Sequence, residues 1–346
     1  MGALVRVFRH RVLALFLVLT MAWVGACATG DGSSEFGSIE RADPRFDALV
    51  PPDARLEKLA EGFVWAEGPV WVPEGEYLLF SDVPQNVVFK WKDGEGLTEY
   101  LKPSGYTGSG SPGREPGSNG LLLDAQGRLV LCQHGDRRVS RLGKDGSFLE
   151  LVSGYQGKRF NSPNDAAFRS NGDLYFTDPP YGLTGLNNSP VKELGFNGVY
   201  RLSAEGELSL LTDQISFPNG IAFSPDEKNL YVAVSDRENP VLMKYDVNED
   251  GTIGNGRVFF DTKPWTRAYL GVPDGLKVDR DGNLFATGPG GVNVFSPDGT
   301  FLGRINPGVA TANCGWGHDG SVLYITADSY LCRIKLNTKG QMPFAQ

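Results

Sequence analysis

A six-fold internal repeat is the feature that most limits what this chain can fold into. Each copy consists of a short apolar strand, a tight turn rich in Asp, Asn and Gly, and a second strand rich in Tyr, Phe, Val and Leu. Further strand-like segments follow, and four short strands recurring at intervals of about 40 to 50 residues are typical of propeller blades. The copies begin near Trp65, Ser118, Ser162, Phe217, Val272 and Ala312. We therefore predict an all-β fold, a six-bladed β-propeller of four-stranded blades.

The two ends of the repeat region indicate how the ring closes. The sixth copy lacks a fourth strand, because the residues after Leu336 show no strand pattern. The segment ARLEKLA, residues 54–60, precedes the first copy and is available to fill that place. We predict that this N-terminal strand becomes the outer strand of the last blade, which leaves no exposed sheet edge there. No linker marks a second domain, so the propeller domain is expected to cover residues 51–346.

The N-terminal region has the pattern of an export signal. Three arginines precede a 15-residue apolar run from Val12 to Ala26, which is too short to span a membrane but is typical of a secretory signal. The run ends in VGAC at positions 24–27, which resembles the cleavage box of bacterial lipoproteins. We predict a signal peptide over 1–26, a lipidated Cys27 and a flexible tether over 27–50. The alternative is an ordinary signal peptide, in which Cys27 is incidental.

These features imply an exported protein, held by its lipid in a membrane and facing the periplasm or the cell exterior. Removal of residues 1–26 takes away three arginines and no acid, so the net charge changes from −8 to −11. Such a surface repels nucleic acid, which excludes a nucleic-acid-binding function. The lipid anchor is the only membrane contact expected, and we expect a monomer.

The remaining cysteines do not form a disulfide framework. Cys132, Cys314 and Cys332 are odd in number and lie in apolar strand-like runs. They are expected to be buried thiols that pack as small hydrophobic side chains. A bridge between Cys314 and Cys332 is the alternative.

One polar position recurs at the start of the first strand in every copy. Six such positions in a pseudo-symmetric ring converge on its axis, so two carboxylates and four amides would lie close together without any Lys or Arg. Crowded buried carboxylates are costly unless a cation neutralises them. Oxygen ligands alone favour a hard divalent cation, calcium ahead of magnesium or manganese, whereas zinc prefers nitrogen and sulfur. Alternatively, these residues simply open strands as turn residues. The six positions are Glu67, Asn119, Asn164, Asn219, Asp274 and Asn313.

Four segments around these positions carry a family resemblance. AEGPVW, SPND, FPNG and VPDGL resemble the signature stretches of the senescence-marker-protein, gluconolactonase and luciferin-regenerating-enzyme family, whose members are six-bladed calcium propellers. The similarity covers residues 50–336 and keeps the family's order and spacing. Carried over by motif, it implies that the metal ligands are Glu67, Asn164, Asn219 and Asp274. It leaves Asn119 and Asn313 to line the substrate pocket.

The resemblance implies a metal-dependent hydrolase that opens sugar lactones, with Asp274 as the base for water attack. His134, Tyr181 and, by a weaker match, Arg159 are the candidate substrate contacts. No Ser-His-Asp arrangement can be recognised in the sequence, which disfavours serine hydrolase chemistry. One alternative is an ester or organophosphate hydrolase on the same metal site. The other is a non-catalytic propeller that binds a ligand or a protein.

Overall fold

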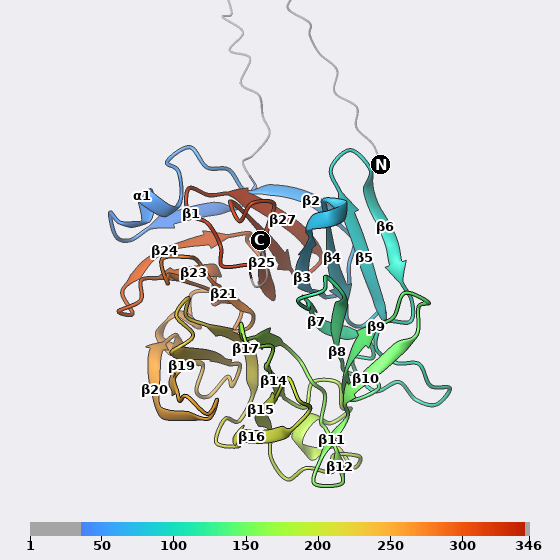
Figure 1. Ribbon diagram of the computed structural model, residues 1–346. Coiled ribbons are helices and arrows are strands. Elements are labelled where there is room, and N and C mark those ends of the chain that lie inside the picture. Colours follow the sequence, from blue (N-terminus) through green and yellow to red (C-terminus); the bar gives the residue numbers. More distant parts are fainter. Residues whose placement is uncertain (1–35, 343–346) are drawn as a thin grey trace, which may run out of the picture. The chain divides into compact units, whose positions relative to one another are not determined.

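Six antiparallel sheets lie around a common axis in the computed structural model, which describes residues 36–342 (Figure 1). The innermost strand of each sheet contacts the innermost strands of both neighbouring sheets, and the last contacts the first, so the ring is closed. The predicted six-bladed β-propeller is therefore confirmed. In ring order the innermost strands are β3 (Ala66–Val72), β7 (Ser118–Leu123), β13 (Ala166–Phe168), β17 (Pro218–Phe223), β21 (Leu276–Val278) and β25 (Asn313–Gly317).

Each blade continues outward through antiparallel strands in sequence order. The first blade adds β4 (Tyr77–Asp82), β5 (Val87–Lys92) and β6 (Gly96–Leu101), and the second adds β8 (Leu129–Gln133), β9 (Arg138–Leu142) and β10 (Phe148–Val152). The third adds β14 (Leu174–Asp178), β15 (Gly198–Leu202) and β16 (Leu208–Thr212), and the fourth adds β18 (Asn229–Val234), β19 (Val241–Val247) and β20 (Ile253–Asp261). The fifth adds β22 (Leu284–Gly288), β23 (Gly291–Phe295) and β24 (Phe301–Asn306), and the sixth adds β26 (Val322–Ala327) and β27 (Tyr330–Lys335). Outside the blades lie a small hairpin and three short 3-10 helices: β11 (Gly154–Tyr155), β12 (Lys158–Arg159), η1 (Pro73–Gly75), η2 (Leu186–Asn188) and η3 (Lys263–Trp265).

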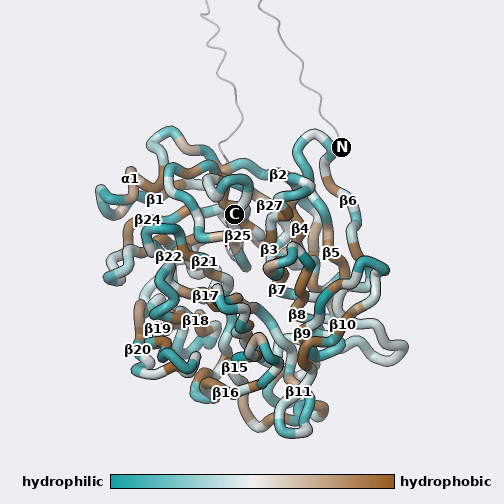
Figure 2. The backbone as a smooth tube through the Cα atoms, viewed as in Figure 1, coloured by the Kyte–Doolittle hydropathy of each residue, from teal (hydrophilic) through white to brown (hydrophobic). Residues whose placement is uncertain are grey.

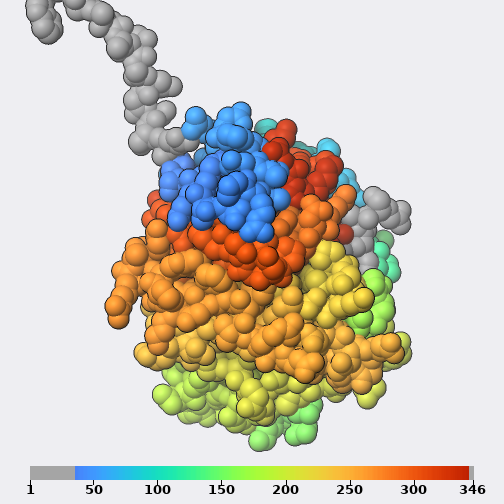
Figure 3. Space-filling model, turned by 90° about the vertical axis from the view of Figure 1, so that its left-hand side faces the viewer, coloured from blue at the N-terminus to red at the C-terminus, as the bar shows by residue number. Residues whose placement is uncertain are grey.

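The N-terminal part of the domain completes the last two blades. Strand β2 (Glu57–Glu61) pairs with β27 as the outer strand of the sixth blade, which confirms the predicted closure. Strand β1 (Ser38–Arg41) pairs with β24, so the fifth blade has five strands and not the predicted four. Figure 3 shows the blue N-terminal residues lying against the orange and red residues of the C-terminal blades.

The flexible tether predicted over 27–50 is wrong for residues 38–50. Besides β1, this segment forms the helix α1 (Phe46–Leu49), and the side chains of Phe46 and Val50 are fully buried in the core of the last two blades. The prediction failed because one short strand and one helical turn show too little periodicity to be recognised. Residues 1–35, with the predicted signal peptide and Cys27, lie outside the described residues. None of the helices within 36–342 is long and apolar enough to cross a membrane.

The middle strands are buried on both faces, because each blade packs against its two neighbours. All five residues of β14 are buried, and so are all five of β22. Their sequences, LYFTD and LFATG, accordingly lack the apolar-polar alternation of a half-exposed strand. Figure 2 shows this pattern as brown stretches within the blades and teal at the turns and loops.

Hydroxyl groups near the ends of second strands join the first blade to the second and the third blade to the fourth. Ser81 Oγ donates to the Asn119 carbonyl oxygen at 2.9 Å, and Thr177 Oγ1 donates to the Asn219 carbonyl oxygen at 2.8 Å. A hydrogen bond of this kind is worth about 1 kcal/mol, and losing it leaves a buried carbonyl group unsatisfied. These bonds fix the inner strands that carry the recurring polar residues.

The three cysteines of the domain are free and buried, as predicted. Cys314 and Cys332 do not face each other, because they lie on β25 and β27 and both pair with Ile325 of the strand between them. The alternative of a bridge between them is therefore wrong.

Candidate metal centre

The six recurring polar residues meet at the axis of the propeller, and we refer to them as the axial ring. Four of them lie within inner strands, whereas Asn164 and Asp274 each lie two residues before one. Five of the six side chains are buried, and Asp274 is partly exposed. The axial ring consists of Glu67, Asn119, Asn164, Asn219, Asp274 and Asn313.

Glycines allow the members of the axial ring to approach one another. A Cβ atom on Gly220 would lie 2.3 Å from the carbonyl oxygen of Asp274, and one on Gly275 would lie 2.1 Å from the side-chain carbon Cγ of Asn313. Both distances are too short for any side chain. The glycine that follows the polar residue in EGP, PNG and PDG is thus required by the packing of neighbouring blades.

In the third blade, the place of this glycine is taken by Asp165, a buried acid that the sequence analysis did not assign. The amide nitrogen Nδ2 of Asn313 lies 3.2 Å from Glu67 Oε2 and 3.5 Å from Asp165 Oδ2. Lys277 Nζ lies 3.9 Å from Asp165 Oδ2. In four of the other five blades a glycine follows the polar residue, and the departure of SPND from this pattern was the available signal for Asp165.

The acids of this centre repel one another in a buried place. Burial, and then the charge of Asp165, raises the pKa of Glu67 to about 7. Burial and the charges of Glu67, Asp165 and Glu115 raise the pKa of Asp274 well above its usual value. Burial also raises the pKa of Asp165, against the opposing effect of Lys277. One partly exposed lysine does not balance this charge, so a divalent cation would stabilise the ionised acids.

Unpartnered polar atoms gather at the same centre. Of the ten buried side-chain nitrogen and oxygen atoms without a hydrogen-bond partner in the described residues, five belong to it. Buried polar groups are nearly always satisfied, so such a cluster indicates a bound polar species. The five atoms are Asn119 Oδ1, Asn164 Oδ1, Asp274 Oδ1, His134 Nδ1 and the Tyr181 hydroxyl oxygen.

Two amides of the axial ring have their nitrogen atoms occupied. Asn219 Nδ2 donates to Ser235 Oγ at 2.9 Å, and Asn164 Nδ2 lies 3.4 Å from His134 Nε2. With the nitrogen held in this way, an amide leaves its oxygen for another partner. Within residues 36–342, no three His, Cys, Asp or Glu side chains are grouped so that they alone could hold a metal. The residues therefore fit a hard cation only if amide oxygens complete the set.

Two buried aspartates hold the loops that lead into the ring. Asp82 accepts hydrogen bonds from the backbone nitrogens of Val64 and Trp65, just before Glu67. Asp178 accepts hydrogen bonds from the backbone nitrogens of Asn161 and Ser162, just before Asn164, and both are 2.8 Å long. Each aspartate follows a hydroxyl residue that joins neighbouring blades, so the pairs Ser-Asp and Thr-Asp at the ends of second strands position the axial ring.

Of the three predicted substrate contacts that lie outside the axial ring, the structure brings two to the centre. The His134 side chain is fully buried beside Asn164, and burial lowers the pKa of this histidine to about 3, so the ring is neutral. Tyr181 stacks on Phe217 with ring centroids 5.9 Å apart. Burial raises the pKa of Tyr181, so its hydroxyl group stays a hydrogen-bond donor.

Arg159 lies elsewhere. Its backbone nitrogen donates to Glu193 Oε2 at 2.9 Å and its guanidinium donates to the Asp136 carbonyl oxygen at 3.1 Å. The residue is exposed, and none of its recorded partners belongs to the axial ring. Its predicted contact with substrate stays a prediction without geometric support.

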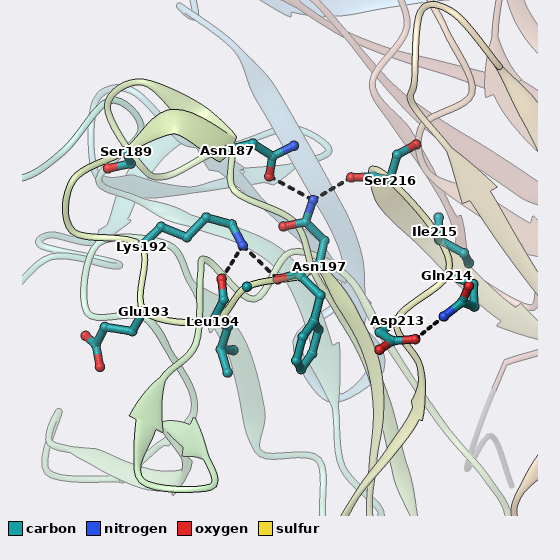
Figure 4. Close-up of a pocket in the computed structure, with 12 residues that line it drawn as sticks. Asn187, Ser189, Lys192, Glu193, Leu194, Asn197, Asp213, Gln214, Ile215 and Ser216 are labelled. Carbon is teal, nitrogen blue, oxygen red and sulfur yellow. Dashed lines mark hydrogen bonds between the residues drawn. The ribbon is translucent and has the colours of Figure 1, made fainter.

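A separate polar pocket of about 560 Å³ opens between the loop before β15 and the loop before β17 (Figure 4). Lys192 occupies one side, where Nζ donates to the carbonyl oxygens of Leu194 and Phe196 at 2.5 and 2.8 Å. Asp213 and Ser216 lie on the other side. No member of the axial ring lines this pocket, so it is distinct from the centre described above.

The comparison with known proteins agrees with the architecture. The family model described as SMP-30/Gluconolactonase/LRE-like region matches residues 65–329. A gluconolactonase from Zymomonas mobilis is 40% identical over 352 residues, which cover 97% of this chain and 99% of that protein. A diisopropyl-fluorophosphatase from Loligo vulgaris is 28% identical over 260 residues, which cover 70% of this chain and 78% of that protein.

A solved structure with the same fold is also similar to this chain in sequence. The gluconolactonase from Xanthomonas campestris superposes with a TM-score of 0.76 at 32% identity, over 88% of this chain and 97% of that one. Fold and centre together define a six-bladed propeller with an acidic, oxygen-lined axis. The chain belongs to the SMP-30/gluconolactonase/LRE-like family.

Proposed function

We propose that this protein is a metal-dependent lactone hydrolase that opens sugar lactones at the axial ring. The observation that carries the proposal is the cluster of unpartnered oxygens from Asn119, Asn164 and Asp274 among acids of raised pKa. The family relatives that are gluconolactonases supply the substrate class. A sugar lactone is small, neutral and reactive at one carbonyl group, which suits a narrow polar centre.

The residues that would hold one divalent cation are Glu67, Asn164, Asn219 and Asp274. Calcium is the preferred ion, because the donors are oxygens alone and come from several blades of the protein. When bound, such a cation polarises the ester carbonyl group and stabilises the negative charge that develops on its oxygen. Asn119, Asn313 and Tyr181 then contact the sugar hydroxyl groups.

Asp274 acts as the base. Its Oδ1 atom has no hydrogen-bond partner, and the residue keeps the partial exposure that a reacting group needs. Water adds to the lactone carbonyl carbon while Asp274 takes its proton. The bond between this carbon and the ring oxygen then breaks, and the proton passes to the leaving oxygen, which gives the open-chain acid.

The first experiment is hydrolysis of glucono-δ-lactone in a pH-stat, with and without EDTA, beside Asp274→Ala. We expect turnover that EDTA removes, that added calcium restores and that the Asp274→Ala variant lacks. Turnover that persists in EDTA would contradict the metal-dependent reaction. Calcium binding without turnover of any lactone would leave a binding propeller as the better description.

An organophosphate or ester hydrolase is the second candidate. The similarity to the Loligo vulgaris diisopropyl-fluorophosphatase supports it, because the match extends over most of both chains. Fluoride release from diisopropyl fluorophosphate, measured beside the lactone assay, separates the two. The lactonase proposal expects a kcat/KM for the lactone that exceeds the value for the organophosphate.

We also propose that the protein is exported and is anchored by a lipid on Cys27. Support comes from the apolar run over 12–26 and the VGAC box, which lie outside the described residues. Labelling with a radioactive fatty acid should mark the wild-type protein and not Cys27→Ala. Labelling that survives this substitution would leave an ordinary signal peptide.

A further inference from the structure

The long loop between β6 and β7, residues 102–117, brings a partly buried acid to His134, which lies beside the axial ring. The Glu115 side chain is only 17% exposed, with Oε1 2.7 Å from Arg114 Nη1 and Oε2 3.6 Å from His134 Nδ1. The loop is fixed on both sides of this acid, because the Arg114 backbone nitrogen donates to the Gly182 carbonyl oxygen at 3.1 Å and the Gly117 nitrogen donates to the Val83 carbonyl oxygen at 2.8 Å.

His134 connects this acid to the axial ring. Its Nε2 atom lies 3.4 Å from Asn164 Nδ2, and an amide nitrogen can only donate. Nε2 is therefore the acceptor, and the ring proton resides on Nδ1, which faces the Glu115 carboxylate. The distance of 3.6 Å exceeds a hydrogen bond, so the carboxylate acts on this N–H group by electrostatic attraction.

The contact with His134 determines the orientation of the Asn164 amide. With Nδ2 directed at His134, Oδ1 is the unpartnered atom. An amide without such a neighbour can turn by 180° and present its NH2 group, which cannot ligate a cation. His134 itself is fully buried, so it reaches the ring through Asn164 and not by exposure to a substrate.

We propose that His134 and Glu115 are positioning residues, which hold the Asn164 amide with its oxygen toward the bound cation. The inference rests on the cation site of the proposed function but does not depend on the substrate. Support of a ligand by an outer partner typically changes metal affinity by about 10- to 100-fold.

The test is calcium affinity of the metal-free protein by isothermal titration calorimetry. His134→Ala should weaken calcium binding by about 10- to 100-fold. His134→Gln should restore most of the affinity, because its amide oxygen can accept from Asn164 and its NH2 group can donate to Glu115. Glu115→Gln should fall between the wild type and His134→Ala, because the amide of glutamine still offers one acceptor oxygen. The matched control is His318→Ala, which removes the other histidine of the described residues, an exposed one bonded to the Tyr324 hydroxyl at 3.1 Å.

Each contrary result has a distinct meaning. Calcium affinity unchanged in His134→Ala would overturn the inference. Equal losses in His134→Ala and His134→Gln would also overturn it, because they would point to the packing of the histidine and not to its hydrogen bond. A wild-type protein that binds no divalent cation would remove the proposed metal site and this inference together. Affinities in the expected order, in a protein that hydrolyses no lactone, would support the inference and overturn only the proposed reaction.

Discussion

Asn313 Nδ2 lies 3.2 Å from Glu67 Oε2, although the two residues are 246 positions apart in the sequence. Asn313 begins the inner strand of the last blade, and Glu67 lies in the inner strand of the first. The candidate metal centre therefore spans the junction at which the ring closes. Anything that loosens this junction should disturb the centre as well as the fold.

Removal of the closing segment tests this dependence. A variant that lacks residues 1–62 loses β1, α1 and β2, exposes the edge of β27 and removes the buried side chains of Phe46 and Val50. We expect it to aggregate or to unfold without a sharp thermal transition, because exposed strand edges pair with other chains. A variant that lacks only residues 1–35 is the control and should elute as a monomer with a sharp transition. Equal behaviour of the two variants in size exclusion and melting would contradict the role of β2.

The role of Asp274 as a base can be separated from its role as a ligand. Asp274→Asn keeps an oxygen that can face the cation but cannot take a proton. We expect lactone turnover to fall by about 100- to 10,000-fold, the usual contribution of general base catalysis. Calcium should still bind to this variant, but with a lower affinity. Asp281→Asn, in an exposed turn, is the matched control and should keep wild-type turnover. A turnover loss no larger than the loss of calcium occupancy would leave Asp274 as a ligand alone.

Calcium should stabilise the protein less at acidic pH than at neutral pH. Burial raises the pKa of Glu67 and of Glu115 to about 7 from ordinary values of 4.5. Between these values the metal-free folded protein holds protons that the unfolded chain has released, so its stability falls as the pH rises. A cation requires ionised ligands, so the calcium-induced increase in Tm should be larger at about pH 8 than at about pH 5.

Thermal melts in EDTA and in calcium, over this pH range, check the prediction. The Glu67→Gln variant is the control, because it removes one of the titrating groups and should flatten the dependence of the metal-free Tm on pH. A calcium-induced increase in Tm that is as large at about pH 5 as at about pH 8 would contradict the assignment of Glu67 as a metal ligand.

The glycines of the axial ring should tolerate no side chain. Gly220→Ala places a methyl group 2.3 Å from the Asp274 carbonyl oxygen and is expected to reduce the free energy of unfolding by about 1 to 3 kcal/mol. Calcium affinity should fall with it, because Asp274 must move. Gly195→Ala is the matched control, since a Cβ atom there would meet nothing within 4 Å. Equal Tm values for the two variants would show that the inner strands are less tightly packed than described.

The architecture and the axial ring could be predicted because pseudo-symmetry repeats the same information. Six blades carry one polar residue at the same place, so a position such as Asn164 is supported by five others. The closing strand was predictable for a related reason, since the sixth copy lacked a strand and residues 54–60 were available to supply it. A feature that occurs once has no such support.

The residues missed were those that occur once. Asp165 replaces a glycine in one blade, and only the packed structure reveals that it is buried beside Glu67. Glu115 lies in an irregular loop whose path depends on contacts with Gly182 and Val83. The strand β1 and the helix α1 are each four residues long, and the pairing of β1 and the burial of α1 depend on blades formed more than 200 residues later in the sequence.

The order of β1, α1 and β2 along the chain has a mechanical consequence. A pull on the N-terminus reaches β1 first, where four residue pairs, from Ser38 with Asn306 to Arg41 with Gly303, join it to β24. The closing strand β2 begins 16 residues after β1 ends, beyond α1. If β1 peels away, α1 must also come free before the force reaches β2, which pairs with β27 in the sixth blade. In a propeller pulled at this end, β1 and α1 would therefore yield before the strand that closes the ring.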